Sequence, residues 1–67
     1  MNESAPLVSV VMNCYNGERY LAEAIGSVYA QSYCHWEIIF WDNQSTDASA
    51  TIAQSYDARL RYIRAAE

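Results

Sequence analysis

The chain has 67 residues, of which 52% are hydrophobic and 13% aromatic, and its formal net charge is -4. This composition is too apolar and too aromatic for a disordered chain, and the length allows one thin core in at most one domain. All four basic residues are arginines and the pI is about 4.7, so DNA, RNA and anionic membrane surfaces are not expected as partners.

The sequence also predicts the compartment and the redox state of the cysteines. The longest apolar run, residues 38–41, is far shorter than the ~20 residues that cross a bilayer, and residues 1–4 lack the charged and apolar regions of a signal peptide. We therefore expect a cytoplasmic protein. Two cysteines, Cys14 and Cys34, are too few for a disulfide framework and are expected to be buried, reduced thiols. The alternative is a single disulfide bridge between them. His35 beside Cys34 fits no structural zinc pattern.

The first predicted element is a strand over residues 7–12, whose nearly continuous β-branched run is typical of a strand covered on both faces. Asn16 and Gly17 then predict a turn. A helix follows over about residues 18–31, because apolar residues recur there at the spacing of one helical face. Gly26 within this helix either approaches another backbone closely or is merely tolerated, and the second reading is favoured.

The second half of the chain predicts one more helix and two more strands. A short aromatic and β-branched run indicates a strand over residues 36–41. Turn formers and N-cap candidates occupy residues 42–47, and a helix is predicted over about residues 46–56. The last strand, over residues 60–64, has polar positions that favour the edge of a sheet.

This order of elements predicts an α/β fold. Two β-α-β units with short connections give right-handed crossovers and parallel strands, so β-α-β-α-β is half of a doubly wound, three-layer Rossmann-like sheet. Ligands of such sheets bind beyond the carboxyl ends of the strands, near the place where the strand order reverses. We expect that place at the first strand, whose free side would receive the next strand.

Polar side chains follow the predicted strands at their carboxyl ends. Tyr15 offers an aromatic face on which a base can stack, or it simply covers the end of the sheet. Asp42 and Asn43 can accept hydrogen bonds from a base or a ribose hydroxyl. The spacing alone favours the alternative that Asp42 caps the second helix or binds turn amides.

Other chemistries are disfavoured. The loop after the first strand holds a single glycine, Gly17, and the chain has no lysine, so neither a dinucleotide-binding loop nor a Walker loop is present. A phosphoryl-acceptor aspartate is disfavoured for the same lack of lysine. His35 precedes the second strand, at the end of the sheet opposite Tyr15, and therefore completes no Ser-His-acid set. The residues alone indicate a half-built nucleotide site.

Two motifs at the right separation resemble the GT-A-fold glycosyltransferases of family 2, which transfer a sugar from a nucleotide-diphosphate donor. Residues 8–17 resemble the opening strand and Tyr-Asn turn of that family, and residues 20–28 and 31–33 resemble its next segments. Residues 37–47 resemble its second strand and Asp-Asp-Gly-Ser-Thr-Asp signature. The resemblance implies that residues 1–67 are the amino-terminal nucleotide-binding part of an incomplete family 2 domain. It also implies that the complete enzyme acts in polysaccharide biosynthesis.

The resemblance also implies roles for individual residues. Tyr15 would stack on the base, commonly uracil, and Asp42 with Asn43 would bind base or ribose. The complete implied nucleotide-binding set is Asn13, Cys14, Tyr15, Asn16, Asp42 and Asn43. Three positions depart from the family pattern: Asn43 replaces the second Asp, Gln44 replaces Gly, and Asn13 stands where Pro or Thr is common. A UDP-sugar is the first expectation for the donor.

Members of the family hold a divalent cation, Mg or Mn, through an Asp-x-Asp motif one strand further on, and use a carboxylate base later still. Asp42, Asp47 and Asp57 form no such motif. We therefore expect no catalytic residue and no metal ligand here, and no catalysis by this chain alone. The alternatives are a small nucleotide-binding or interaction module that self-associates through an exposed first strand, and a remnant that binds no nucleotide.

Overall fold

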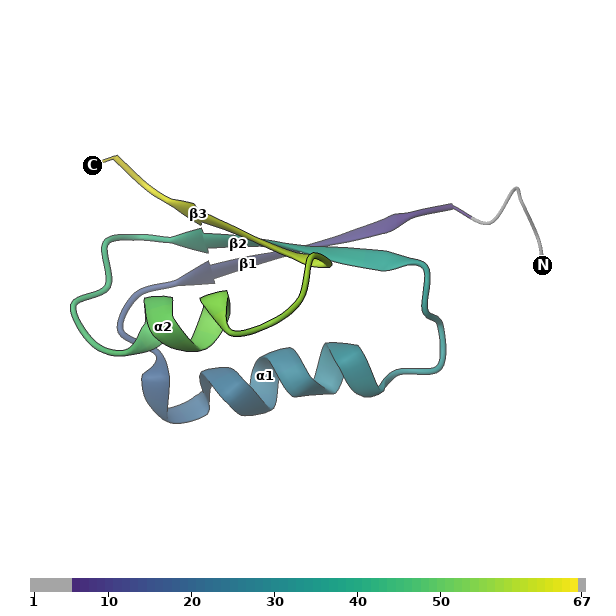
Figure 1. Ribbon diagram of the computed structural model, residues 1–67, viewed down its shortest axis with the longest axis horizontal. Helices are drawn as coiled ribbons and strands as arrows, with labels where there is room; N and C mark the ends of the chain where they lie inside the picture. The colour runs from purple at the N-terminus through teal and green to yellow at the C-terminus, as the bar shows by residue number, and fades with distance from the viewer. Residues whose placement is uncertain (1–5, 67) are drawn as a thin grey trace.

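The computed structural model describes residues 6–66 as a three-stranded parallel sheet with two helices on one of its faces (Figure 1). Residues 1–5 and 67 lie outside the described residues. The prediction that residues 1–4 are not part of a signal peptide therefore also lies outside them. The elements are β1 (Val8–Cys14), α1 (Glu18–Ala30), β2 (Trp36–Asp42), α2 (Ser49–Gln54) and β3 (Leu60–Arg64). The predicted β-α-β-α-β order and the parallel pairing are confirmed.

The strands lie in the order β1-β2-β3, so β2 is central and β3 is an edge strand, as its polar positions predict. Val8 is level with Trp36 at one end of the β1–β2 pair, and Cys14 is level with Asp42 at the other. Both crossovers have the same hand, which places both helices on the same face of the sheet (Figure 1). This arrangement is consistent with the amino-terminal part of a GT-A Rossmann-like fold.

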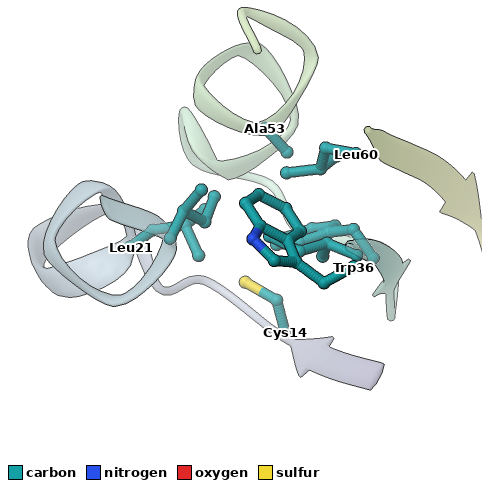
Figure 2. Close-up of a cluster of buried hydrophobic side chains, with 8 residues drawn as sticks. Cys14, Leu21, Trp36, Ala53 and Leu60 are labelled. Atoms are coloured by element: carbon teal, nitrogen blue, oxygen red, sulfur yellow. The ribbon is translucent and has the colours of Figure 1, made fainter. Parts of the chain in front are cut away.

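The core fills the space between the helices and the sheet. Leu21 and Ile25 on α1 and Ala53 on α2 meet the inward side chains of the strands. The strands contribute every second residue because side chains alternate between the faces of a sheet. Figure 2 shows the Cys14 sulfur pointing into this cluster. The buried apolar members are Cys14, Leu21, Ile25, Trp36, Ile38, Phe40, Ala53 and Leu60.

The prediction that the first strand is covered on both faces is wrong for the described residues. Val11 on β1 is 64% exposed, because the two helices cover only the opposite face. The open face of the sheet, as we call it, carries the apolar side chains Val11, Ile39, Trp41 and Ile63. Residues 6–66 thus supply two of the three expected layers. Cys34 also differs from its prediction, since this free thiol is exposed in the loop before β2.

Element boundaries differ from the predicted ones mainly at α2. The predicted helix begins at residue 46, whereas α2 runs from Ser49 to Gln54. Backbone amides of residues 46–48 are instead bound by side chains from the loop after β1. Gly26 has no atom within 4 Å of the place where a Cβ would stand, so this glycine is tolerated in α1 as expected.

An aromatic cluster closes the amino-terminal end of the sheet. The Tyr29 and Trp36 rings meet edge to face with centroids 4.7 Å apart. The Arg59 guanidinium lies over both rings, 4.4 Å from the Trp36 centroid and 4.8 Å from that of Tyr29. Tyr56 packs against Tyr29 with ring centroids 5.3 Å apart.

Neither helix within residues 6–66 has the length and apolar character needed to cross a membrane.

Candidate functional site

The carboxyl ends of the three strands meet at one edge of the sheet, as predicted. The backbone N–H of Asn43 donates to the carbonyl of Cys14 at 2.8 Å, which continues the β1–β2 pairing by one residue. The N–H of Ala65 donates to the carbonyl of Asp42 at 2.8 Å and does the same for β3. The loops that follow β1 and β2 therefore begin side by side.

Asp42 is fully buried at this edge, and both of its carboxylate oxygens are occupied. Oδ1 accepts the backbone N–H of Ser45 at 2.9 Å. Oδ2 accepts the Tyr62 hydroxyl and pairs with the Arg64 guanidinium at 3.3 Å. The side chain therefore closes the turn after β2 and ties it to β3, which agrees with the turn-binding alternative for this residue.

These partners keep the buried Asp42 carboxylate charged. Burial raises the pKa of Asp42, but the hydrogen bonds from Tyr62 and Ser45 and the charge of Arg64 outweigh it and bring the pKa below the ordinary 3.8. Burial and the bond to Asp42 raise the pKa of the Tyr62 hydroxyl. At neutral pH the edge thus contains an ionised aspartate bound to a neutral phenol.

The loop after β1 holds the loop after β2 through Asn16. The Asn16 Oδ1 atom accepts two backbone N–H groups, from Thr46 at 2.8 Å and from Asp47 at 3.3 Å. Two residues later, Glu18 Oε1 accepts the N–H of Ala48 at 2.7 Å. These three amides precede α2, where backbone N–H groups have no acceptor within the helix, so the side chains of Asn16 and Glu18 supply the acceptors.

Side chains of the loop after β2 and of the start of α2 in turn accept backbone N–H groups that follow β1. Ser45 Oγ accepts the N–H of Asn16 at 2.9 Å, and Ser49 Oγ accepts the N–H of Gly17 at 2.9 Å. Asp47 accepts the N–H of Glu18 at 3.2 Å, and bonds from Ser49 lower the pKa of Asp47. We call this reciprocal set the loop clasp; its side chains are Asn16, Glu18, Ser45, Asp47 and Ser49.

Backbone conformation bears on Asn16 and Gln44 in these loops, and close packing bears on Gly17. Asn16 and Gln44 have positive φ angles of 52° and 62°, which glycine and asparagine adopt most readily. The glycine that the family signature carries at the position of Gln44 fits this conformation. Gly17 is buried, and a Cβ there would lie 3.1 Å from the Tyr20 ring and 3.2 Å from the Cys14 sulfur. Close packing therefore favours glycine at residue 17.

The six residues of the implied nucleotide set divide into two groups. Tyr15 is 62% exposed, and Asn43 and Asn13 are exposed beside it. Cys14 points into the core, Asp42 is buried, and the Asn16 side-chain oxygen is turned toward the other loop. The structure thus brings Tyr15, Asn43 and Asn13 to the surface of this edge.

Sequence reasoning missed the partners that hold the edge together. Tyr62 and Arg64 are two residues apart on β3, so they share the face of Asp42, and that spacing is the signal that could have identified them. Ser45 was visible only as a turn former or cap candidate, and Ser49 fell inside the predicted helix. No spacing rule predicts that each would bind an amide about 30 residues away in the chain.

A divalent cation does not fit the carboxylates present. Asp42 uses both oxygens within the protein and already faces Arg64, while Asp47 accepts amides through both of its oxygens. Within residues 6–66, no group of three or more His, Cys, Asp or Glu side chains could hold a metal ion. Each of these two carboxylates is committed to the two loops or to β3.

Comparisons with known proteins agree with this geometry. The model of the family described as Glycosyl transferase family 2 matches residues 9–67. EpsE of Bacillus subtilis, named as a candidate glycosyltransferase, is 53% identical over 82% of the chain, which spans 20% of EpsE. TuaG of the same organism, named as a candidate teichuronic acid biosynthesis glycosyltransferase, is 42% identical over 85% of the chain and 23% of TuaG.

A third relative is a glycosyltransferase of Rickettsia typhi, 44% identical over 92% of the chain. The chain spans 20% of that relative, so it matches about a fifth of the length of each of these proteins. The family match includes both loops of the clasp and all three strands. The chain belongs to glycosyltransferase family 2.

Proposed function

We propose that this chain binds the nucleotide part of a nucleotide-diphosphate sugar at the carboxyl-terminal edge of its sheet. Tyr15 stacks on the base, and Asn43 exchanges hydrogen bonds with the base or the ribose. The observation that carries the proposal is the adjacency of these two exposed side chains, which the bond from Asn43 to Cys14 fixes at the ends of β1 and β2.

The other residues of the implied set take supporting places in this proposal. Asn13, exposed on the open face, flanks the nucleotide from that side. Asp42 and Cys14 are buried, and the exposed Asn16 turns its side-chain oxygen to the opposite loop; all three hold Tyr15 and Asn43 in place. An uncharged amide at Asn43 can accept the N–H of uracil, which supports UDP as the first ligand to test.

The affinity of the chain for a nucleotide should be low. No pocket is found among the described residues, so the edge offers one wall rather than an enclosed site. Stacking of a base on an aromatic side chain contributes about 1–3 kcal/mol. With a few exposed hydrogen bonds added, a Kd of about 1 mM or weaker is expected.

We further propose that residues 1–67 form the nucleotide-binding part of a larger domain, and that transfer to an acceptor hydroxyl needs groups elsewhere in that protein. A cation site and a base would come from those groups, since residues 6–66 hold no cluster of three or more His, Cys, Asp or Glu side chains, and Asp42 and Asp47 use both oxygens within the protein. The teichuronic acid in the name of TuaG supports polysaccharide biosynthesis as the process.

Binding is tested by titrating the ¹⁵N-labelled chain with UDP and following the backbone amide shifts. The shifts should concentrate at residues 13–16 and 43–44 and should disappear in Tyr15→Ala. Tyr33→Ala is the matched control, because Tyr33 is an exposed tyrosine in the loop before β2, at the opposite end of the sheet. Equal shifts in the two variants would contradict the proposal.

Catalysis is tested separately by mixing the chain with UDP-sugars, Mg or Mn, and candidate acceptors. No sugar transfer and no donor hydrolysis should be detected above the rate in buffer. Turnover that is lost in Asp42→Ala would contradict the proposal that the chain alone is inactive.

A second candidate function, a self-associating module, is supported by the free edge of β1. The N–H of Val8 bonds to His35 and the carbonyl of Cys14 accepts from Asn43, so the even-numbered residues of β1 face β2. The backbone groups of Ser9, Val11 and Asn13 therefore point away from the sheet. β1 carries no charge, whereas the other edge strand carries two arginines, so β1 is the edge suited to pair with a second copy.

Analytical ultracentrifugation tests this second candidate. Val11→Pro removes an outward N–H without touching the bonds to β2, and should dissociate any oligomer. Val11→Thr keeps that N–H and should leave the oligomer intact. A wild-type chain that stays monomeric, or an oligomer that survives Val11→Pro, would contradict pairing through β1.

A further inference from the structure

We infer that Asn16 is a positioning residue: it locks the loop after β1 to the loop after β2, so that Tyr15 and Asn43 form a preformed nucleotide edge. The inference rests on the proposed nucleotide binding for its purpose, and on the loop clasp for its geometry. Asn16 itself touches no nucleotide and acts through its two neighbours in space.

Asn16 is the centre of the clasp because it bonds in both directions. Its side-chain oxygen accepts two amides of the opposite loop, from Thr46 and Asp47. Its backbone N–H donates to the hydroxyl of Ser45, a buried residue of that same loop. Removing the Asn16 side chain therefore frees residues 46 and 47, and removing the Ser45 hydroxyl frees residue 16.

The positions of Tyr15 and Asn43 explain why a lock at residue 16 matters for binding. Tyr15 lies between Cys14, the last residue of β1, and Asn16. Asn43 lies between Asp42, the last residue of β2, and the turn that Ser45 closes onto Asp42. The backbone of each contacting residue is thus held on both sides. Loops ordered during folding need no further ordering when the nucleotide binds, and affinity is kept.

The residue type at position 16 has two separable requirements. The backbone has a φ of 52°, and the side chain must place an acceptor two bonds from Cβ. Asp meets both requirements, because its carboxylate also accepts amides and it tolerates this φ. Gly meets only the first. The pair Asn16→Asp and Asn16→Gly therefore separates loss of the acceptor from backbone strain.

The test measures backbone order by ¹⁵N relaxation at residues 15–18 and 43–48. Asn16→Gly and Ser45→Ala should each lower the order of both loops, although each changes only one. Asn16→Asp should keep both loops ordered. Ser27→Ala is the matched control, because it removes a side-chain bond to backbone within α1 at a solvent-exposed site. It should leave both loops unchanged.

Uridine is the ligand for the binding arm, because it is uncharged and does not respond to the extra carboxylate of Asn16→Asp. Its affinity should fall about tenfold in Asn16→Gly, since ordering of both loops then accompanies binding. It should stay near the wild-type value in Asn16→Asp and Ser27→Ala. A purely structural role would change the stability of the chain without changing uridine affinity at a temperature where it is fully folded.

Three results would overturn the inference. In the first, Asn16→Gly loosens residues 15–18 while residues 43–48 keep their order. In the second, both loops loosen but uridine affinity is unchanged. In the third, which also decides the matter if Asn16→Gly does not fold, Asn16→Asp loosens both loops. A wild-type chain that binds no uridine contradicts the proposed function instead, while the order measurements still decide whether the clasp exists.

Discussion

The two ends of the sheet are held together by different forces. At the amino-terminal end, the rings of Tyr29 and Trp36 pack against each other, and the Arg59 guanidinium covers them. At the carboxyl-terminal end, the buried Asp42 and the loop clasp bind backbone amides with side-chain oxygens. The rings are stabilised mainly by buried area, with one hydrogen bond from the Tyr29 hydroxyl to Asp57, whereas loop amides near an open site need one acceptor each.

This difference explains why several motif residues do not reach the surface of the carboxyl-terminal edge. The loops that follow β1 and β2 contain amides outside the strand pairing, and the chain satisfies them with side chains from both motifs. The surface that we propose for a nucleotide is formed by the exposed residues Tyr15, Asn43 and Asn13. Substitutions at the two ends of the sheet should therefore differ in their effect on stability.

The largest effect is expected at Asp42. Asp42→Asn removes the charge that faces Arg64 and replaces one acceptor oxygen with a donor, at a fully buried position. The cost should be about 3 kcal/mol, which is most of the stability expected for a domain of this size. Urea unfolding followed by circular dichroism should show a strongly lowered midpoint. Asp57→Asn at the exposed amino-terminal end is the control: it keeps an acceptor oxygen for the Tyr29 hydroxyl and the Arg59 N–H, and should alter the midpoint little.

Acid should weaken the same end of the sheet. The pKa of Asp42 is lowered in the folded state, so its contribution to stability is present above about pH 4 and is lost as the pH falls through the folded pKa. Tyr62→Phe removes one bond to the carboxylate and should move this loss to higher pH. The free energy of unfolding between pH 2 and pH 6 measures it. An identical pH profile for the variant would refute the coupling.

An intermediate effect is expected from the clasp. Ser49→Ala leaves the buried N–H of Gly17 without its acceptor and should cost about 1–3 kcal/mol. Thermal unfolding measures the change. Ser27→Ala serves again as the control, because its hydroxyl bonds to a helix carbonyl in an exposed position. Equal melting temperatures for the two variants would mean that the clasp adds nothing to stability.

The smallest effect is expected at the amino-terminal end. Arg59→Ala removes the guanidinium that lies over two rings, and cation–π contacts at exposed sites contribute about 0.5–1 kcal/mol. The packing of Tyr29 on Trp36 remains, so the urea midpoint should fall only slightly. A loss as large as that of Asp42→Asn would show that both ends depend equally on a charge.

Much of the fold was predictable because its elements are local patterns. The apolar spacing that includes Ile25 predicts α1, and the alternation around Tyr62 predicts an edge strand at β3. The exposure of Val11 was not predictable, since it depends on which face both helices take. The late start of α2 was also hidden, because Asn16 binds amides that a sequence reading assigns to the helix. The sequence predicted that the candidate residues lie at the carboxyl ends of the strands. Which of them are exposed and which are buried could be seen only in the structure.

The proposed placement of a nucleotide at Tyr15 and Asn43 is tested most directly by an intermolecular NOE measurement on the chain with UDP. If the clasp presents Tyr15 and Asn43 to the nucleotide, the uracil protons should show NOEs to the Tyr15 ring and to the Asn43 side-chain amide. NOEs from uracil to Tyr29 or Trp36 at the amino-terminal end, with none to Tyr15, would contradict the account.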